Sequence, residues 1–438
     1  ITKTKIPANQ IEASELADNA VDTNAIADNA VSSAKIPTNA VTQAKIADDA
    51  VGADQLASNA VVTASIADNA ITQAKINVPI SNRNLIINGA MQVAQRGTSV
   101  ASTGYKTVDR WQLGGSWQGS AITQEQANVG YNSTPYDKGF RKSFKLTNSN
   151  QGSASAADNI EITYSFEGQE IATSGWDYVN SSKKITLSFW VKSSVAQTFY
   201  GYFRTFPGVD VKNSFPIVCS TTDWEYKTVS IVGESNFAEN AQNSFPNNSN
   251  KAMVLRIVPF YGTNYTDSGA INNAWQNYSS SNITPVFDTS WYLTNGATFE
   301  ITGVQLEVGD TATDFEHRSF HDERQRCYRY FQRWATGDGA DIGLGCYFNG
   351  SQINIVCDLF TPMRATPTLS MITGTHYYVI YRDAAADTFN SLTIDTASPD
   401  RVNVRNNSEV SGSGGQTGMA RCNNAAPNGG QVDFIAEL

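Results

Sequence analysis

The stretch Val41-Thr42-Gln43-Ala44-Lys45-Ile46-Ala47-Asp48-Asp49-Ala50 decides how the first part of the chain folds, because it is one of eight successive copies of a ten-residue unit. A large aliphatic residue stands at the first and the sixth position of every unit. A strict short period predicts a stalk or an array, in which each unit contacts mainly its neighbours.

The spacing of five residues between aliphatics fits neither a straight helix nor a strand. Five residues turn about 140° on a helix, and they change face on a strand. The chain must therefore change direction inside each unit, through a single helical turn around Thr42–Lys45 or as a strand-like spiral. Gly52 is the only glycine before residue 80, which excludes collagen, and heptads are absent, which excludes an ordinary coiled coil.

A single chain cannot bury the repeat aliphatics, because two per unit do not offset the backbone entropy of folding. Disorder is one interpretation, but a solvated linker does not require aliphatic residues at such regular spacing. Three chains wound together can fill one axis, so we expect a homotrimeric stalk. Its core would contain Val21, Ile26, Val31, Ile36, Val41, Ile46, Val51, Leu56, Val61 and Ile66.

Composition narrows the class of protein. The 438 residues carry a net charge of −10 with no basic block, which argues against nucleic acid as a partner. No apolar run is long enough to insert into a membrane. Five widely spaced cysteines show no metal or redox pattern and suggest free thiols in a protein assembled inside a reducing cell. Because Ile1 stands inside a repeat, we expect the chain to be part of a longer one.

The rest of the chain predicts a mainly β protein. Short alternating runs such as 185–191, 224–231 and 299–306 are separated by turn-rich segments, which indicates a jelly-roll β-sandwich. We therefore expect a repeat stalk at 1–80, a sandwich body at 81–318, a helical connector at 319–330 and a small C-terminal β-sandwich tip at 331–438. Ser319 is the expected helix N-cap.

Several motifs resemble bacteriophage tail fibres. Asn84–Gly97 followed by Asp109-Arg110-Trp111 resembles the opening of a domain common in these fibres, and Gly303–Gly309 with Ala312–Glu316 resembles its close. Arg326–Phe331 and Pro362–Thr368 resemble the terminal module that usually follows. The stalk repeat is also similar to those of phage fibres, so the resemblance covers nearly the whole chain. The opening also resembles jelly-roll carbohydrate-binding modules.

The resemblance implies a virion tail fibre that acts outside the cell after assembly in the host cytoplasm. Its N-terminal side would join a virion tail or adaptor protein, and its C-terminal part would attach to a host surface polysaccharide or lipopolysaccharide. Two other functions stay open, a fibre-borne polysaccharide depolymerase and a purely structural virion spacer.

Catalytic machinery is scarce in the sequence. Only three histidines are present, and no nucleophile elbow or phosphate-binding loop stands out. His317 and His321 have zinc-ligand spacing, but a solvated or interface pair explains them better. We expect no enzymatic activity and no cofactor. The one candidate ion is a structural calcium, placed by analogy with carbohydrate-binding jelly rolls at Asn88, Asp310 and Asp314.

The C-terminal module concentrates aromatic residues beside the glycine-rich loop 411–415. Sugar recognition favours an aromatic face near a few polar groups. Strand alternation sends Tyr377 and Tyr381 to one face and His376 and Tyr378 to the other, and one face must be core. The sequence therefore predicts glycan binding by some of Tyr347, Phe348, His376, Tyr377, Tyr378 and Tyr381.

Overall fold

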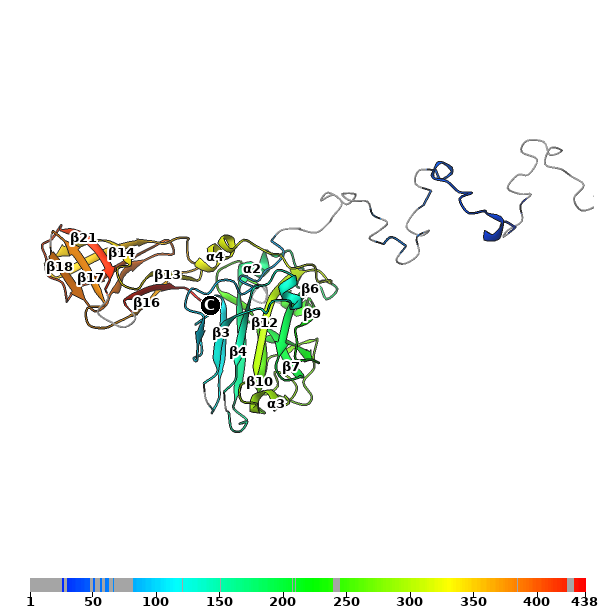
Figure 1. Ribbon diagram of the computed structural model, residues 1–438, viewed down its shortest axis with the longest axis horizontal. Helices are drawn as coiled ribbons and strands as arrows, with labels where there is room; N and C mark the ends of the chain where they lie inside the picture. The colour runs from blue at the N-terminus through cyan, green and yellow to red at the C-terminus, as the bar shows by residue number, and fades with distance from the viewer. Residues whose placement is uncertain are drawn as a thin grey trace, which may run out of the picture. The chain divides into compact units, whose positions relative to one another are not determined.

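The structure is a computed structural model and divides into two units, residues 1–78 and 79–438. Figure 1 shows the sheets and helices of the second unit. The structure describes residues 26, 30–47, 50–51, 56, 60–62, 66, 82–119, 121–149, 151–206, 208, 210–238, 245–383, 385–423 and 429–438. None of the helices within these ranges is long and apolar enough to cross a membrane.

The described repeat units each contain one tight turn. The 3-10 helices η2 (Ser33–Lys35) and η3 (Gln43–Lys45) occupy equivalent positions in successive units. In both units the lysine ammonium donates a hydrogen bond back to the alanine that ends the preceding unit, at 2.6 Å for Lys35 and 2.7 Å for Lys45. A single helical turn, rather than a strand-like spiral, is therefore how these units change direction.

The described repeat aliphatics keep much of their surface exposed in this single chain. Ile36 and Ile46 are 45% and 43% exposed, and Val31 and Val41 are 56% and 58% exposed. Similar exposure holds for Ile26, Val51, Leu56, Val61 and Ile66. Val21 lies outside the described residues. The trimeric stalk core stays a prediction, since the structure contains one chain.

Residues after the repeat units form a β-sandwich of two six-stranded antiparallel sheets. The first sheet has the order β1-β3-β4-β12-β6-β9 and the second β11-β8-β7-β10-β5-β2. The strands of the first are β1 (Ser99–Val100), β3 (Thr123–Asn128), β4 (Lys142–Thr147), β6 (Lys184–Ser193), β9 (Glu225–Val232) and β12 (Thr298–Val308). Those of the second are β2 (Trp111–Ser116), β5 (Asn159–Glu167), β7 (Gln197–Thr205), β8 (Val211–Cys219), β10 (Lys251–Tyr261) and β11 (Trp275–Asn277).

Strand alternation builds the sandwich core. Phe144 and Leu187 from the first sheet pack in one cluster with Ile162 and Leu255 from the second, all fully buried. Short helices lie in the connections: α1 (Thr134–Asp137), α2 (Gly168–Ala172), η7 (Ser235–Ala238) and α3 (Ser290–Leu293). The expected mainly β fold with a jelly-roll sandwich is confirmed by this topology.

Helix α4 (Phe320–Tyr328) connects the sandwich to the C-terminal module, and the Ser319 hydroxyl caps it by accepting from the backbone N–H of Asp322 at 3.1 Å. The module has a three-stranded sheet, β13-β22-β16, and a seven-stranded sheet, β18-β17-β21-β14-β15-β20-β19. The strands are β13 (Phe331–Thr336), β14 (Asp341–Asn349), β15 (Gln352–Asp358), β16 (Thr368–Ile372), β17 (Tyr378–Arg382), β18 (Ala385–Phe389), β19 (Thr393–Ala397), β20 (Arg401–Asn406), β21 (Thr417–Cys422) and β22 (Gln431–Ile435).

The two sheets of the C-terminal module share a core. Val432 and Phe434 from β22 pack in one cluster with Ile355 from β15 and Val404 from β20. This β-sandwich begins directly after α4, and it contacts the first sandwich closely enough that residues 79–438 form one unit.

A buried arginine joins the sandwich to the C-terminal module. Arg110 has no exposed surface, and its guanidinium carbon lies 3.3 Å from the ring centroid of Tyr330 and 4.9 Å from that of Tyr164. It forms an ion pair with Glu437 at 3.1 Å. The neighbouring Trp111 is also fully buried. Asp109-Arg110-Trp111 therefore serves the packing of the two modules and is not accessible to a ligand.

Candidate functional site

A groove of about 570 Å³ lies on the outer face of the first sheet. In β6, Leu187, Phe189 and Val191 point into the core, so alternation places Ser188 and Trp190 on the other face. Trp190 pairs with Tyr226 of the edge strand β9, and their ring centroids lie 5.1 Å apart. These two rings form the floor of what we call the aromatic groove.

The first wall of the aromatic groove comes from α1 and the residues after it, and it brings Phe140 over the floor. Gly303 in β12 makes this approach possible, because a Cβ there would lie 2.6 Å from the Phe140 ring. Gly303 also has φ +62°, a conformation that favours glycine, within the register shift between Thr302 and Gln305. The first wall therefore depends on one irregular position in the central strand.

The second wall is the segment 312–317, which follows β12. The rings of Phe315 and His317 lie 4.9 and 5.1 Å from that of Phe140, so the two walls meet in a three-ring cluster. His317 donates through Nε2 to the Lys138 carbonyl at 2.9 Å, which ties the walls together. Asp137, Lys138 and Asp314 line the groove with exposed charged side chains.

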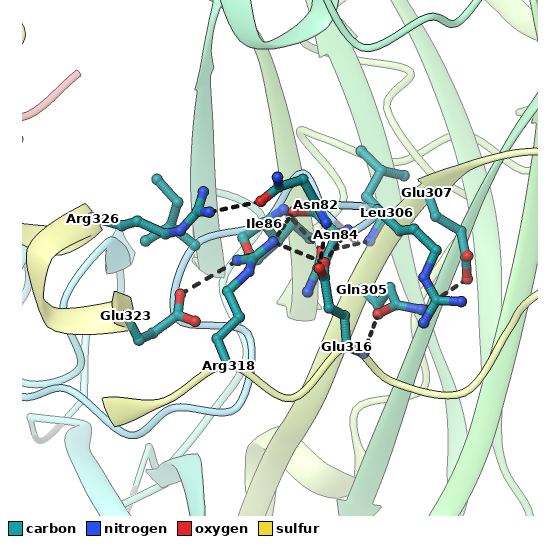
Figure 2. Close-up of polar contacts among 12 residues, drawn as sticks. Asn82, Asn84, Ile86, Gln305, Leu306, Glu307, Glu316, Arg318, Glu323 and Arg326 are labelled. Carbon is teal, nitrogen blue, oxygen red and sulfur yellow. Dashed lines mark hydrogen bonds and ion pairs between the residues drawn. The ribbon is translucent and has the colours of Figure 1, made fainter. Parts of the chain in front are cut away.

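Figure 2 shows the polar network that anchors the second wall to the residues that open the sandwich. The Glu316 carboxylate accepts from the backbone N–H groups of Asn82 and Asn84, the latter at 2.8 Å. Arg318 donates to the carbonyls of Asn84 and Ile86 and forms an ion pair with Glu316 at 3.1 Å. Burial opposes ionisation of Glu316, but these bonds outweigh it and leave the pKa of Glu316 lowered.

The same wall is tied to the floor strand β12. The Gln305 side-chain carbonyl accepts from the backbone N–H of Glu316 at 2.8 Å (Figure 2). The Glu307 carboxylate accepts from the Thr313 backbone N–H at 2.9 Å. Gln305 and Glu307 are both buried. The second wall is thus held at both ends, by β12 and by Arg318.

The calcium ion expected at Asn88, Asp310 and Asp314 stays a prediction, and the structure shows which bonds these residues already make. The side-chain amide of Asn88 donates to the carbonyls of Val93 and Asp109 and accepts from the Val93 N–H. Asp310 and Asp314 are exposed, and no cluster of three or more His, Cys, Asp or Glu side chains suited to a metal occurs in the described residues. The backbone carbonyls of Asn84 and Ile86, earlier in the same segment, accept from the Arg318 guanidinium.

Two of the six aromatic residues named for glycan binding are core residues, which corrects the sequence-based expectation. Tyr347 is 1% exposed and donates to Asp387, while the loop 411–415 lies against its ring, since a Cβ on Gly412 would come within 2.5 Å. Tyr378 has no exposed surface, and its hydroxyl bonds the backbone of Ile372 and Gln431. Neither ring can stack on a sugar.

The other four residues do not gather at one place. Phe348 and Tyr381 are 73% and 49% exposed, His376 is exposed, and Tyr377 is half-buried against the core. His376 lies in a turn before β17, near the start of β14, whereas Phe348 lies toward the end of β14. Tyr381 lines a hollow together with Arg382 and Asp383.

The sequence-based reasoning missed the aromatic groove, although part of its signal was visible. The alternation in 185–191 places Trp190 opposite the core-facing residues. The partner strand of β6 and the return of 312–317 over the same face are long-range features, so no local pattern reports them. His317 and His321 do not share a helix, because α4 begins at Phe320.

No protein-family model matches the chain, and no curated protein matches it. Among solved structures, it is similar to a candidate sugar-binding protein from Bacteroides thetaiotaomicron, with 11% identity over 52% of this chain and 100% of that one and a TM-score of 0.28. A family 11 carbohydrate-binding module from Clostridium thermocellum has 12% identity, coverage of 50% and 98%, and a TM-score of 0.23. A cyclase from Fischerella sp. TAU has 9% identity, coverage of 52% and 98%, and a TM-score of 0.29. Such low values leave the function to be argued from the groove's own residues.

Proposed function

We propose that this chain is a non-catalytic glycan-binding fibre protein and that the aromatic groove is its sugar site. The observation that carries the proposal is the pair Trp190 and Tyr226, which lies on the floor of a groove whose rim holds charged side chains. Sugar rings present apolar C–H faces that pack on aromatic rings, while their hydroxyls require hydrogen-bond partners. The groove offers both, and its volume lies within the usual range for ligand sites.

The proposal moves recognition from the C-terminal module to the sandwich. In the C-terminal module the buried Tyr347 and Tyr378 cannot contact a ligand, and the exposed rings lie apart. The aromatic groove instead combines rings from β6, β9 and two loops in one concave surface. The ligand remains a host surface polysaccharide or lipopolysaccharide, as expected from the resemblance to tail fibres.

We infer that the chain assembles as a homotrimer through the stalk, and the exposed aliphatics support this proposal. Val41 and Ile46 leave 58% and 43% of their surface in water in one chain, and parallel copies would cover them. Three linked grooves would also bind a polymer about 10²-fold or more tightly than one weak site does. We place the assembled fibre in a virion tail, joined through its N-terminal side and acting outside the cell.

Binding to polysaccharide extracted from host envelopes tests the function directly. The full chain should bind it, Trp190→Ala should abolish most binding, and the polymer should keep its length because the groove only binds. The absence of Trp190-dependent binding to any glycan would overturn the proposal. Progressive shortening of the polymer, lost on a carboxylate-to-amide change in the groove, would show a depolymerase instead.

The mass of the assembly in solution tests the trimer separately. A species of three chains is expected, and replacement of Ile46 and Ile66 by Asp should loosen the stalk locally while the sandwich stays folded, because repeats contact mainly their neighbours. A stable monomer with an ordered stalk would contradict the proposed assembly.

A further inference from the structure

We propose that the aromatic groove selects neutral glycans and discriminates against sugars that carry a carboxylate. This inference rests on the proposed glycan-binding function and adds the chemical class of the ligand. It follows from the charged groups on the rim and from the residue types that line the groove.

Three charged side chains on the rim lack partners in the described part of the chain. Asp137, Lys138 and Asp314 are exposed, and none of their side chains forms an ion pair or hydrogen bond with another described residue. Charged groups nearby are paired by contrast, since Glu225 contacts Lys227 at 2.8 Å and Glu316 contacts Arg318 at 3.1 Å. The rim charges therefore remain available to a ligand.

Two free carboxylates fit a ligand rich in hydroxyl groups. An ionised carboxylate only accepts hydrogen bonds, and a sugar hydroxyl supplies the donor in a charge-assisted bond that is stronger than a neutral one. Asp137 lies at the end of α1 and Asp314 in the second wall, so hydroxyls of one bound sugar chain can meet acceptors from both walls. Lys138 adds a donor for ring or hydroxyl oxygens.

An acidic sugar would meet the opposite conditions. The rim carries two negative charges and one positive charge, so a carboxylate on the ligand faces net repulsion. Arginine, whose planar guanidinium matches carboxylates and phosphates, does not occur among the residues that line the groove. Arginines next to the groove already have partners. Arg83 donates to the backbone carbonyl of Asp314, Arg141 donates to the carbonyls of Tyr136 and Phe140, and Arg318 anchors the second wall.

Matched polysaccharide pairs provide the test. Each pair contains a neutral polymer and its uronic-acid counterpart: galactan with polygalacturonate, glucan with glucuronan and mannan with polymannuronate. The full chain is assayed against each polymer at low and high salt, with Trp190→Ala as the control for binding in the groove. In at least one pair, the neutral polymer should bind about tenfold more tightly than its uronic-acid counterpart. Methyl esterification of the uronic polymer should restore binding, because it removes the charge and keeps the ring.

The double variant Asp137→Asn/Asp314→Asn should weaken binding of the neutral polymer and narrow the preference over its acidic counterpart. Asp338→Asn, an exposed carboxylate of the C-terminal module, removes a charge away from the groove and should change neither. If Trp190-dependent binding is as tight or tighter for the acidic polymers than for the neutral ones, this inference is wrong, but the glycan-binding function still stands. The absence of Trp190-dependent binding to every polymer would overturn both.

Discussion

The aromatic groove and the C-terminal module both contain several aromatic side chains, but only the groove gathers them into a concave surface. In the groove, β6 and β9 supply the floor, and the segments around 140 and 315 return over it from distant parts of the chain. In the C-terminal module, the rings lie along strands, and alternation sends Tyr378 inward and Tyr381 outward. A ligand site on a β-sheet thus requires covering loops as well as suitable residues on its face.

The covering segment is anchored by Arg318, and its removal tests whether the groove depends on that anchor. Arg318→Ala would leave the carboxylates of Glu316 and Glu323 without their cation and two backbone carbonyls unpaired. We expect a loss of about 3–5 kcal/mol in the free energy of unfolding, as for other broken buried ion pairs. Glycan binding should be lost with it, because the second wall would no longer be fixed.

Arg421→Ala is the matched control in the open C-terminal module. Arg421 contacts Asp341 at 2.7 Å, but the two side chains are 42% and 59% exposed, so the expected loss is less than about 1 kcal/mol. Denaturant unfolding of both variants gives the comparison. Equal midpoints for the two variants would show that the wall does not rely on Arg318.

This contrast also explains how much the sequence could predict. The alternation in 185–191 and 299–306 follows from local packing, and it was sufficient to predict the mainly β sandwich. The same alternation left open which face of 376–381 is core, and the partners of β17 decided it. The pairing of Trp190 with Tyr226 joins strands that are distant in sequence, and the register of such a pair cannot be deduced from the sequence of either strand alone.

The joint between the two modules contains a carboxyl group whose ionisation should make stability depend on pH. Burial raises the pKa of Asp109 from its ordinary value of 3.8 to about 6, despite the nearby charge of Arg96 and the bonds from Gln95. The folded protein therefore holds a proton that the unfolded chain releases at lower pH. The free energy of unfolding should fall as pH rises from about 4 to about 6, by about 3 kcal/mol from this group.

Asp109→Asn isolates that contribution, because the amide stays uncharged. The difference in unfolding free energy between the parent chain and the variant, measured across this pH range, should slope downward and become flat above about pH 7. Glu316 has a lowered pKa and acts in the opposite sense at lower pH, but it is present in both proteins and cancels. A difference that does not change with pH would contradict a raised pKa at Asp109.

Trp190→Ala should weaken glycan binding in the sandwich by about tenfold or more per site, because a stacked ring and its buried apolar surface are lost. The fold should tolerate the change, since the side chain is only half-buried on the outer face. Affinity for a neutral polysaccharide and the thermal unfolding midpoint are the two measurements. Unchanged affinity with an unchanged midpoint would remove the groove from the binding site.

The smallest effect concerns two tyrosines with nearly equal exposure, 44% for Tyr226 on β9 and 49% for Tyr381 on β17. Both lie on outward sheet faces, but Tyr226 lies within the walled groove, whereas Tyr381 lines an open hollow. Tyr226→Ala should weaken binding by about three- to tenfold, and Tyr381→Ala should leave it unchanged. Because the two tyrosine side chains are buried to a similar extent, the two substitutions should change the free energy of unfolding equally little. If binding instead falls on Tyr381→Ala or Phe348→Ala and not on Tyr226→Ala, recognition belongs to the C-terminal module, as the sequence first predicted.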